Sequence, residues 1–171
     1  MKMASLQKIF SSLNEAGVRY LIAGGLAVNA HGYQRLTVDL DLIIHLKNPN
    51  ILAAFTALST LGYQPTVPVT KEAFAEPDNR KKWFDEKKMR VLNLFSDHHP
   101  ETPLDIFVKE PFDFDEAYES AMRVALFPGL VVSFVSVPAL IKMKKYTGRL
   151  RDQDDIDHLN LLLEEMNDDS K

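Results

Sequence analysis

The 171-residue chain contains no cysteine. This absence excludes a disulfide framework, a zinc site built from thiolates and a catalytic cysteine. The chain also lacks any uncharged run near the ~20 residues that a membrane-spanning helix needs. Its charged start, Met1 to Phe10, is followed by no apolar signal core. We therefore expect a cytoplasmic protein with no membrane partner.

An excess of basic residues is missing as well. Lys and Arg number 20 against 24 Asp and Glu, which gives a formal net charge of −4. A protein that coats nucleic acid non-specifically is expected to be basic, so this composition disfavours that class. What is present is a globular balance, with 46% hydrophobic and 26% charged residues. The length is typical of one domain.

The hydrophobic pattern predicts a mixed α/β (α+β) domain. Helices are expected over 4–16, 26–31, 51–62, 112–120, 137–146 and 152–166, and strands over 18–23, 40–44, 89–95, 104–108, 122–127 and 130–135. Because this order lacks regular βαβ alternation, we expect a mixed, partly antiparallel sheet flanked by helices. One domain over 1–171 is predicted, with a core at about 18–135 and a C-terminal helical part at about 136–168.

Acidic residues interrupt two apolar strands. Asp39 and Asp41 lie two residues apart, so on a strand both side chains would point to one face. Two carboxylates ~4 Å apart repel by about 4 kcal/mol at an effective dielectric constant near 20. A divalent cation would offset this repulsion. Asp105 interrupts the second strand and would complete a set of three carboxylates if the strands are neighbours. The alternative is that these acids simply face solvent.

A glycine pair precedes the acids. Gly24 and Gly25 follow the strand over 18–23 and lead into the next helix. Glycine lets the backbone approach a phosphate closely, and a helix N-terminus presents free N–H groups. The pair alone is equally consistent with a tight turn. Thirteen residues separate Gly25 from Asp39, and the combination is more specific than either part.

This combination resembles the signature of the DNA polymerase β-type nucleotidyltransferase superfamily. The stretch that also contains His31-Gly32, Arg35 and Thr37 is similar to its minimal bacterial and archaeal members, among them abortive-infection (AbiEii-like) toxins. The C-terminal half resembles their lysine, glycine-arginine and double-aspartate pattern, at Leu140, Lys144, Gly148-Arg149, Asp152, Asp155-Ile156 and Leu159. The resemblance spans about residues 18–160.

The resemblance implies transfer of a nucleoside monophosphate from an NTP to a hydroxyl acceptor, with Mg²⁺ or Mn²⁺ as cofactor. It implies catalytic and metal-binding roles for Asp39, Asp41 and Asp105, and nucleotide binding by Gly24, Gly25, Arg35, Thr37 and Lys144. Many relatives have a serine after the second glycine, whereas this chain has Leu26. That phosphate contact would therefore come from backbone N–H groups or from Arg35 and Thr37.

Several alternatives stay open. The acceptor is an RNA, a protein or a small molecule. The same fold could instead serve as a catalytically inactive nucleotide- or partner-binding module, such as one half of a toxin–antitoxin pair. Lys144 could form a structural ion pair with Asp152 or Asp155. Basic residues around Trp83 could grip single-stranded RNA, although a charged helix anchored by one tryptophan is the simpler interpretation.

Overall fold

The computed structural model describes residues 1–170, and the side chain of Arg151 lies outside the described part. The helices are α1 (Met3–Glu15), α2 (Gly24–Ala30), α3 (Asn48–Thr60), α4 (Lys71–Ala75), α5 (Pro77–Asp85), α6 (Phe114–Glu119), α7 (Val137–Thr147) and α8 (Leu150–Asp168). The strands are β1 (Tyr20–Ile22), β2 (Leu40–Ile44), β3 (Gln64–Pro65), β4 (Val91–Phe95), β5 (Leu104–Phe107), β6 (Met122–Phe127) and β7 (Leu130–Phe134). Within residues 1–170, none of the helices is both long and apolar enough to cross a membrane.

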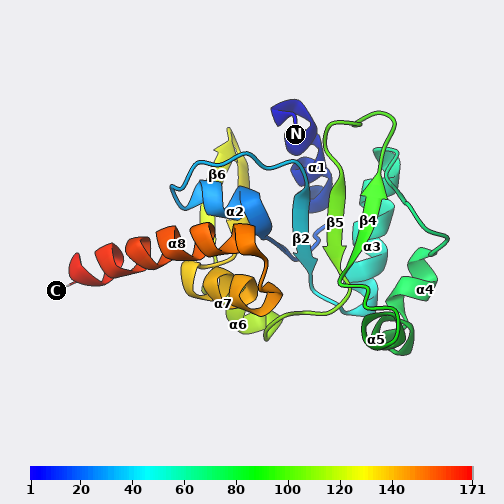
Figure 1. Cartoon of the computed structure of the whole chain (residues 1–171). Coiled ribbons are helices and arrows are strands. Elements are labelled where there is room, and N and C mark those ends of the chain that lie inside the picture. Colours follow the sequence, from blue (N-terminus) through cyan, green and yellow to red (C-terminus); the bar gives the residue numbers. More distant parts are fainter. Residues whose placement is uncertain (171) are drawn as a thin grey trace.

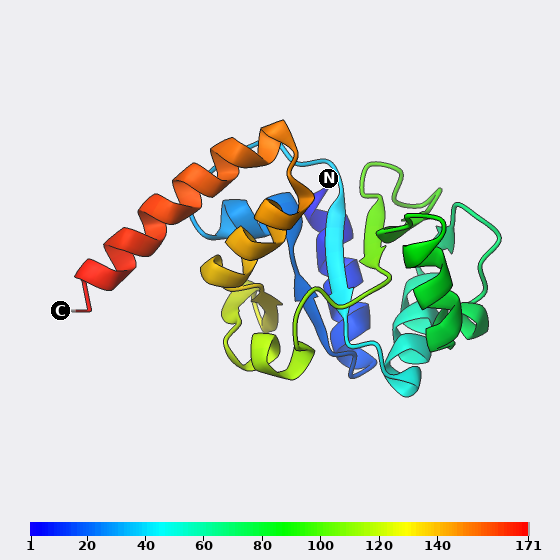
Figure 2. The same cartoon turned by 60° about the horizontal axis from the view of Figure 1, so that its bottom comes forward.

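In the described part of the chain, seven strands form one sheet in the order β3-β4-β5-β2-β1-β7-β6. Two neighbouring pairs, β2 with β5 and β1 with β7, are parallel, and the other pairs are antiparallel. Helices α2, α7 and α8 lie together on one side of β2, and α3, α4 and α5 lie on the other side (Figures 1 and 2). This confirms the mixed, partly antiparallel sheet with flanking and C-terminal helices.

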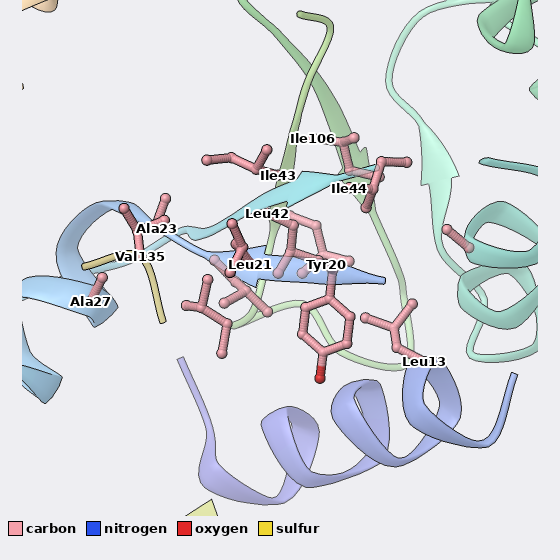
Figure 3. Packing of buried hydrophobic residues seen from close by; sticks show 14 of the residues in the cluster. Leu13, Tyr20, Leu21, Ala23, Ala27, Leu42, Ile43, Ile44, Ile106 and Val135 are labelled. Atoms are coloured by element: carbon pink, nitrogen blue, oxygen red, sulfur yellow. The ribbon is translucent and has the colours of Figure 1, made fainter. Parts of the chain in front are cut away.

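The core between α1 and the sheet follows from helical periodicity. Leu6, Ile9, Phe10 and Leu13 recur on one side of α1 and are buried. The ring of Phe10 stacks on Tyr20 of β1, with 6.1 Å between the ring centroids. Leu13 lies beside the same tyrosine (Figure 3). Burial of this apolar stripe fixes α1 under the central strands.

The two faces of the sheet are covered unequally. Along β4, Leu92 and Leu94 are buried, whereas Asn93 and Phe95 between and after them are exposed. Successive strand residues point to opposite faces. One face of β4 is therefore packed into the core, and the other is open. The acids of the neighbouring strands lie on this second face.

Element boundaries differ from the sequence-based expectation in a few places. The strand over 40–44 and the strands over 122–127 and 130–135 are confirmed to within a residue. Helix α2 begins at Gly24, two residues before the predicted start. The two-residue strand β3 was not predicted, because so short a segment has no periodicity. In α5, Trp83 packs against Phe74 with 6.3 Å between ring centroids, in agreement with an anchored charged helix.

Candidate active site

Strand register brings two of the predicted acids side by side. In the parallel pair β2–β5, Asp41 lies opposite Asp105. Residues paired across neighbouring strands point to the same face, and both side chains are half-buried. Asp39 is exposed and precedes β2, so the expectation that it lies on the strand was wrong. Burial is the largest cause that raises the pKa of Asp41 and of Asp105, and the negative charge of Asp39 adds to the rise in both.

The carboxyl group of Asp41 is strongly perturbed. Burial is the main cause that raises its pKa from 3.8 to about 7, and the charges of Asp105 and Asp39 add to the rise. Lys144 and Arg149 act in the opposite direction. Desolvation and like charges both disfavour the ionised form. Additional positive charge would therefore stabilise the ionised form of Asp41.

An amide on the next strand orients Asp105. Asn93 lies opposite Asp105 in the antiparallel pair β4–β5, and its Nδ2 donates a hydrogen bond to Oδ1 of Asp105 at 2.6 Å. Burial raises the pKa of Asp105, and this hydrogen bond lowers it in part. Sequence reasoning did not single out Asn93. The available signal was one polar residue inside the apolar alternation of β4.

The two glycines let the first turn of α2 pack directly against the acids. A Cβ atom on Gly24 would lie 1.8 Å from Oδ2 of Asp41, and the φ angle of this glycine is +62°. A Cβ atom on Gly25 would lie 2.5 Å from Oγ1 of Thr37. Side chains are therefore excluded at both positions. The backbone at Gly24 comes close to Asp41 as a result, and the first N–H groups of the helix have no acceptor inside it.

The segment 31–39, which we call the site loop, joins α2 to β2 and carries Arg35 and Thr37. Its position is fixed by Asn29, whose amide accepts from the Arg35 N–H and donates to the Arg35 carbonyl, both at 2.9 Å. The Arg35 side chain reaches α8, where Nε lies 2.9 Å from Oδ1 of Asp155. This is a charge contact without the alignment of a hydrogen bond. Arg35 and Thr37 both lie beside Gly25, where an added Cβ atom would come within 3.0 Å of Nη2 of Arg35.

Lys144 is buried on α7 and paired with two acids of α8. Its Nζ donates to Oδ2 of Asp155 at 2.6 Å and to Oδ1 of Asp152 at 3.1 Å. Thr147 donates to the second oxygen of Asp152 at 2.7 Å. Burial alone would raise the pKa of Asp152, but the Thr147 hydrogen bond and the Lys144 charge lower it. These contacts agree with the ion-pair alternative, and the Lys144 charge also acts to lower the pKa of Asp41, which burial raises.

Arg149 is a further cation that sequence reasoning left out of the site. It is exposed and follows Gly148, whose left-handed conformation (φ +62°) ends α7. Its charge acts to lower the pKa of both Asp41 and Asp105, each of which is raised mainly by burial. The signal in the sequence was the glycine-arginine pattern that it forms with Gly148.

The carboxylates do not form a closed metal cage. Among residues 1–170, no three His, Cys, Asp or Glu side chains are placed to hold a metal ion by themselves. Instead of three converging acids, the sheet presents the pair Asp41 and Asp105, with Asp39 nearby outside the strand. Two carboxylates leave coordination positions that a ligand would have to fill.

Comparison with models of protein families finds no match, and comparison with curated proteins finds none either. Solved structures do match. The lincomycin-bound lincosamide antibiotic adenylyltransferase LnuA superposes with a TM-score of 0.58 at 16% identity, over 95% of this chain and 98% of LnuA. ANT(2″)-Ia in complex with adenylyl-2″-tobramycin gives 0.57 at 14% identity, over 98% of both chains. A candidate nucleotidyltransferase from Thermotoga maritima gives 0.58 at 14% identity, over 95% of this chain and 92% of the other.

These matches span nearly the whole chain at low sequence identity, so they speak to the fold. The mixed sheet with its C-terminal helices is shared with proteins described as adenylyltransferases or nucleotidyltransferases. The chain therefore has the nucleotidyltransferase fold.

Proposed function

We propose that the protein is a metal-dependent nucleotidyltransferase that moves a nucleoside monophosphate from an NTP to a hydroxyl acceptor. The observation that carries this proposal is the register of β2 and β5, which pairs Asp41 with Asp105 directly beside the first turn of α2. The two acids, the first turn of α2 and Arg35 are thereby neighbours. Nucleotidyl transfer requires alignment and charge neutralisation more than covalent chemistry by the protein.

The donor set fits a hard divalent cation. Carboxylate oxygens are the ligands that Mg²⁺ and Mn²⁺ prefer, and Mg²⁺ is commonly held by one or two carboxylates together with substrate phosphates. Asp41 and Asp105 supply such a pair, and the pKa of each is raised by burial first and then by the charge of neighbouring acids. Asp39 would add a third carboxylate from outside the strand. When bound, the ion would neutralise charge on the phosphates of the NTP.

The chain's own groups would hold and orient the phosphates. The free N–H groups in the first turn of α2 include those of Gly24, which is half-buried, and of Gly25, which is buried against Thr37 and Arg35. Arg35 and Thr37 of the site loop lie against Gly25. Lys144 would contribute charge from α7. Leu26 provides no hydroxyl, so these groups replace the serine of related proteins.

The acceptor hydroxyl would react next to Asp105. Its oxygen forms a bond to the α-phosphorus, the bond from that phosphorus to the bridging oxygen breaks, and pyrophosphate leaves. The hydroxyl proton passes to the Asp105 carboxylate, one oxygen of which is held by Asn93. The second oxygen is then left to face the acceptor.

One observation favours a second candidate, a binding module without turnover. The Lys144 ammonium is already neutralised by two buried carboxylates, and Arg35 contacts one of them. In such a module, these ion pairs would serve the fold alone. The predicted likeness to abortive-infection toxins, with an antitoxin as partner, belongs with either candidate. Co-purification with the product of a neighbouring gene tests that part.

Thermal stability with each NTP and Mg²⁺ or Mn²⁺ tests nucleotide binding. A ligand at 100 times its Kd adds ~2.7 kcal/mol to the free energy of unfolding, which is a shift of a few degrees in Tm. We expect such a shift for the wild type and its loss in the Asp39→Asn/Asp41→Asn double variant. The control is Asp157→Asn, which changes an exposed acid of α8 that accepts a hydrogen bond from Gln153, and this variant should keep the shift.

Turnover separates the two candidates. An NTP labelled at the α-phosphate is incubated with the protein, Mg²⁺ and a cell extract that supplies RNA, protein and small-molecule acceptors. Label transferred by the wild type and not by the double variant supports the transferase. An NTP-dependent shift in Tm without transfer to any fraction favours the module. The absence of any shift in the wild type would contradict nucleotide binding altogether.

A further inference from the structure

Helix α8 brings one carboxylate between two cations that lie far apart in the sequence. Asp155 is only 1% exposed. Its Oδ2 accepts from Lys144 of α7 at 2.6 Å, and its Oδ1 lies 2.9 Å from Nε of Arg35 in the site loop. Each oxygen of the carboxylate is thus committed to a different cation. A single side chain connects three separate segments of the fold.

One of these two cations lies directly beside the proposed site. The Arg35 guanidinium lies against the first turn of α2, where a Cβ atom on Gly25 would come within 3.0 Å of Nη2. Lys144 is the second cation of this bridge, and its charge acts to lower the pKa of Asp41, which burial raises. Asp155 therefore joins a cation beside the first turn of α2 to a buried cation of α7.

The site loop is attached to α8 at a second point. Tyr33 donates a hydrogen bond to Asp154, and its ring stacks on His158 with 3.7 Å between the centroids. Together with the Arg35 contact, these interactions fix the site loop against successive turns of α8. The loop also carries Thr37 and ends at Asp39. A shift of α8 would consequently move several residues of the proposed site together.

Stability alone is a weak explanation for the buried charges. Taking ions out of water is unfavourable, and buried ion pairs are often no better for stability than apolar residues of similar size. Helices α7 and α8 also have an apolar contact surface in Leu140, Ile156 and Leu159, all of which are buried. A requirement on the position of Arg35 and Lys144 explains why charged groups are used at this place.

We propose that Asp155 is a positioning residue, which holds the Arg35 guanidinium and the Lys144 ammonium in place for the nucleotide phosphates. The proposal rests on the proposed function, since it assumes that these two cations contact the NTP. Asp155 itself does not touch the nucleotide. It acts by fixing where the two positive charges stand before the NTP arrives.

Calorimetric titration of each NTP in the presence of Mg²⁺, without acceptor, gives the Kd that tests this proposal. We expect Asp155→Asn to raise the Kd by about 10- to 100-fold, the range typical for residues that orient ligating groups. Asp157→Asn on the same helix should keep the wild-type Kd. Arg35→Gln should also raise the Kd. In the double variant Arg35→Gln/Asp155→Asn, the Kd should rise by less than the product of the two single fold-changes, because both changes act on the same interaction.

Asp155→Glu covers the case in which Asp155→Asn does not fold. It keeps the charge but moves both oxygens by one methylene group, so we expect it to fold and still to bind the NTP more weakly. If the Asp155 ion pairs were purely structural, disturbing them would lower the urea midpoint of these variants and leave the Kd of the folded protein for the NTP unchanged. That result in Asp155→Glu, or in a folded Asp155→Asn, overturns the positioning role alone. A wild type that binds no NTP overturns the proposed function and this inference together.

Discussion

Replacing Asp41 by Asn should stabilise the metal-free protein at alkaline pH. Burial, followed by the charges of Asp105 and Asp39, raises the pKa of Asp41 from 3.8 in the unfolded chain to about 7 in the fold. This difference is roughly 3 pH units, and each unit corresponds to 1.36 kcal/mol, so the ionised carboxylate lowers the free energy of unfolding by about 4 kcal/mol. Asparagine resembles the protonated acid in shape and carries no charge.

The sign of the pH dependence follows from proton binding. Between about pH 4 and pH 7 the unfolded chain has released the Asp41 proton while the folded chain retains it, so raising the pH favours unfolding. The stabilising effect of the protonated acid is complete below the unfolded pKa and is lost as the pH rises through the folded value. Asp41→Asn should therefore match the wild type near pH 4 and exceed it by up to about 4 kcal/mol at pH 8.

Urea unfolding at pH 5, 6, 7 and 8 with a chelator present measures this difference. The gap between Asp41→Asn and the wild type should widen with pH, whereas Asp157→Asn should show no widening because its side chain is exposed. Millimolar Mg²⁺ should narrow the gap by stabilising the wild type. A gap that is constant from pH 5 to pH 8, or a variant that is less stable than the wild type at pH 8, would refute the reasoning.

Three further outcomes are expected. Gly24→Ala should lower the free energy of unfolding by the ~1–2 kcal/mol that a left-handed conformation costs an alanine, and by ~1–3 kcal/mol more because the new methyl group overpacks against Asp41. Gly17 has a similar φ angle of +66° but lies in open space, so Gly17→Ala should show only the first of these two losses. Equal urea midpoints for the two variants would contradict the contact with Asp41. Asn93→Ala should raise the pKa of Asp105 above its burial-raised value by removing a hydrogen bond that lowers it, so the acid limb of kcat/KM moves to higher pH; a limb that stays in place argues against Asp105 as proton acceptor. Lys144→Ala should raise the KM for the NTP and also lower the free energy of unfolding by ~3–5 kcal/mol, since buried carboxylates lose their partner; an unchanged KM in the folded protein would remove Lys144 from the site.

Local patterns were sufficient for most elements of the fold. The stripe Leu6, Ile9, Phe10 and Leu13 predicts α1 because helical period and burial on one side coincide. The strand over 40–44 is recovered with its full bounds, since an apolar run between polar segments limits it at both ends. The two-residue strand β3 and the start of α2 at Gly24 were missed, because neither leaves a period in the sequence.

The site was only partly accessible from the sequence. Asp41 and Asp105 could be proposed as neighbours because each interrupts an apolar strand, and the parallel pairing of β2 and β5 confirms that they adjoin. Asn93 could not be proposed, since a single asparagine in a strand gives no sign of what lies opposite. Asp39 lies outside the strand because pairing of β2 with β5 begins at Leu40. The two-residue spacing between Asp39 and Asp41 does not reveal where that pairing begins.

The sequence by itself determined most of the helices and strands and placed Asp41 and Asp105 within apolar strands, because these depend on periods of two and 3.6 residues within short segments. The tertiary structure decided which of them meet. Asp41 faces Asp105 through strand register, and Gly24 is held against Asp41 by the turn into α2. Asp155 joins Arg35 to Lys144 because helix packing closes a distance of more than a hundred residues along the chain, which no local pattern encodes.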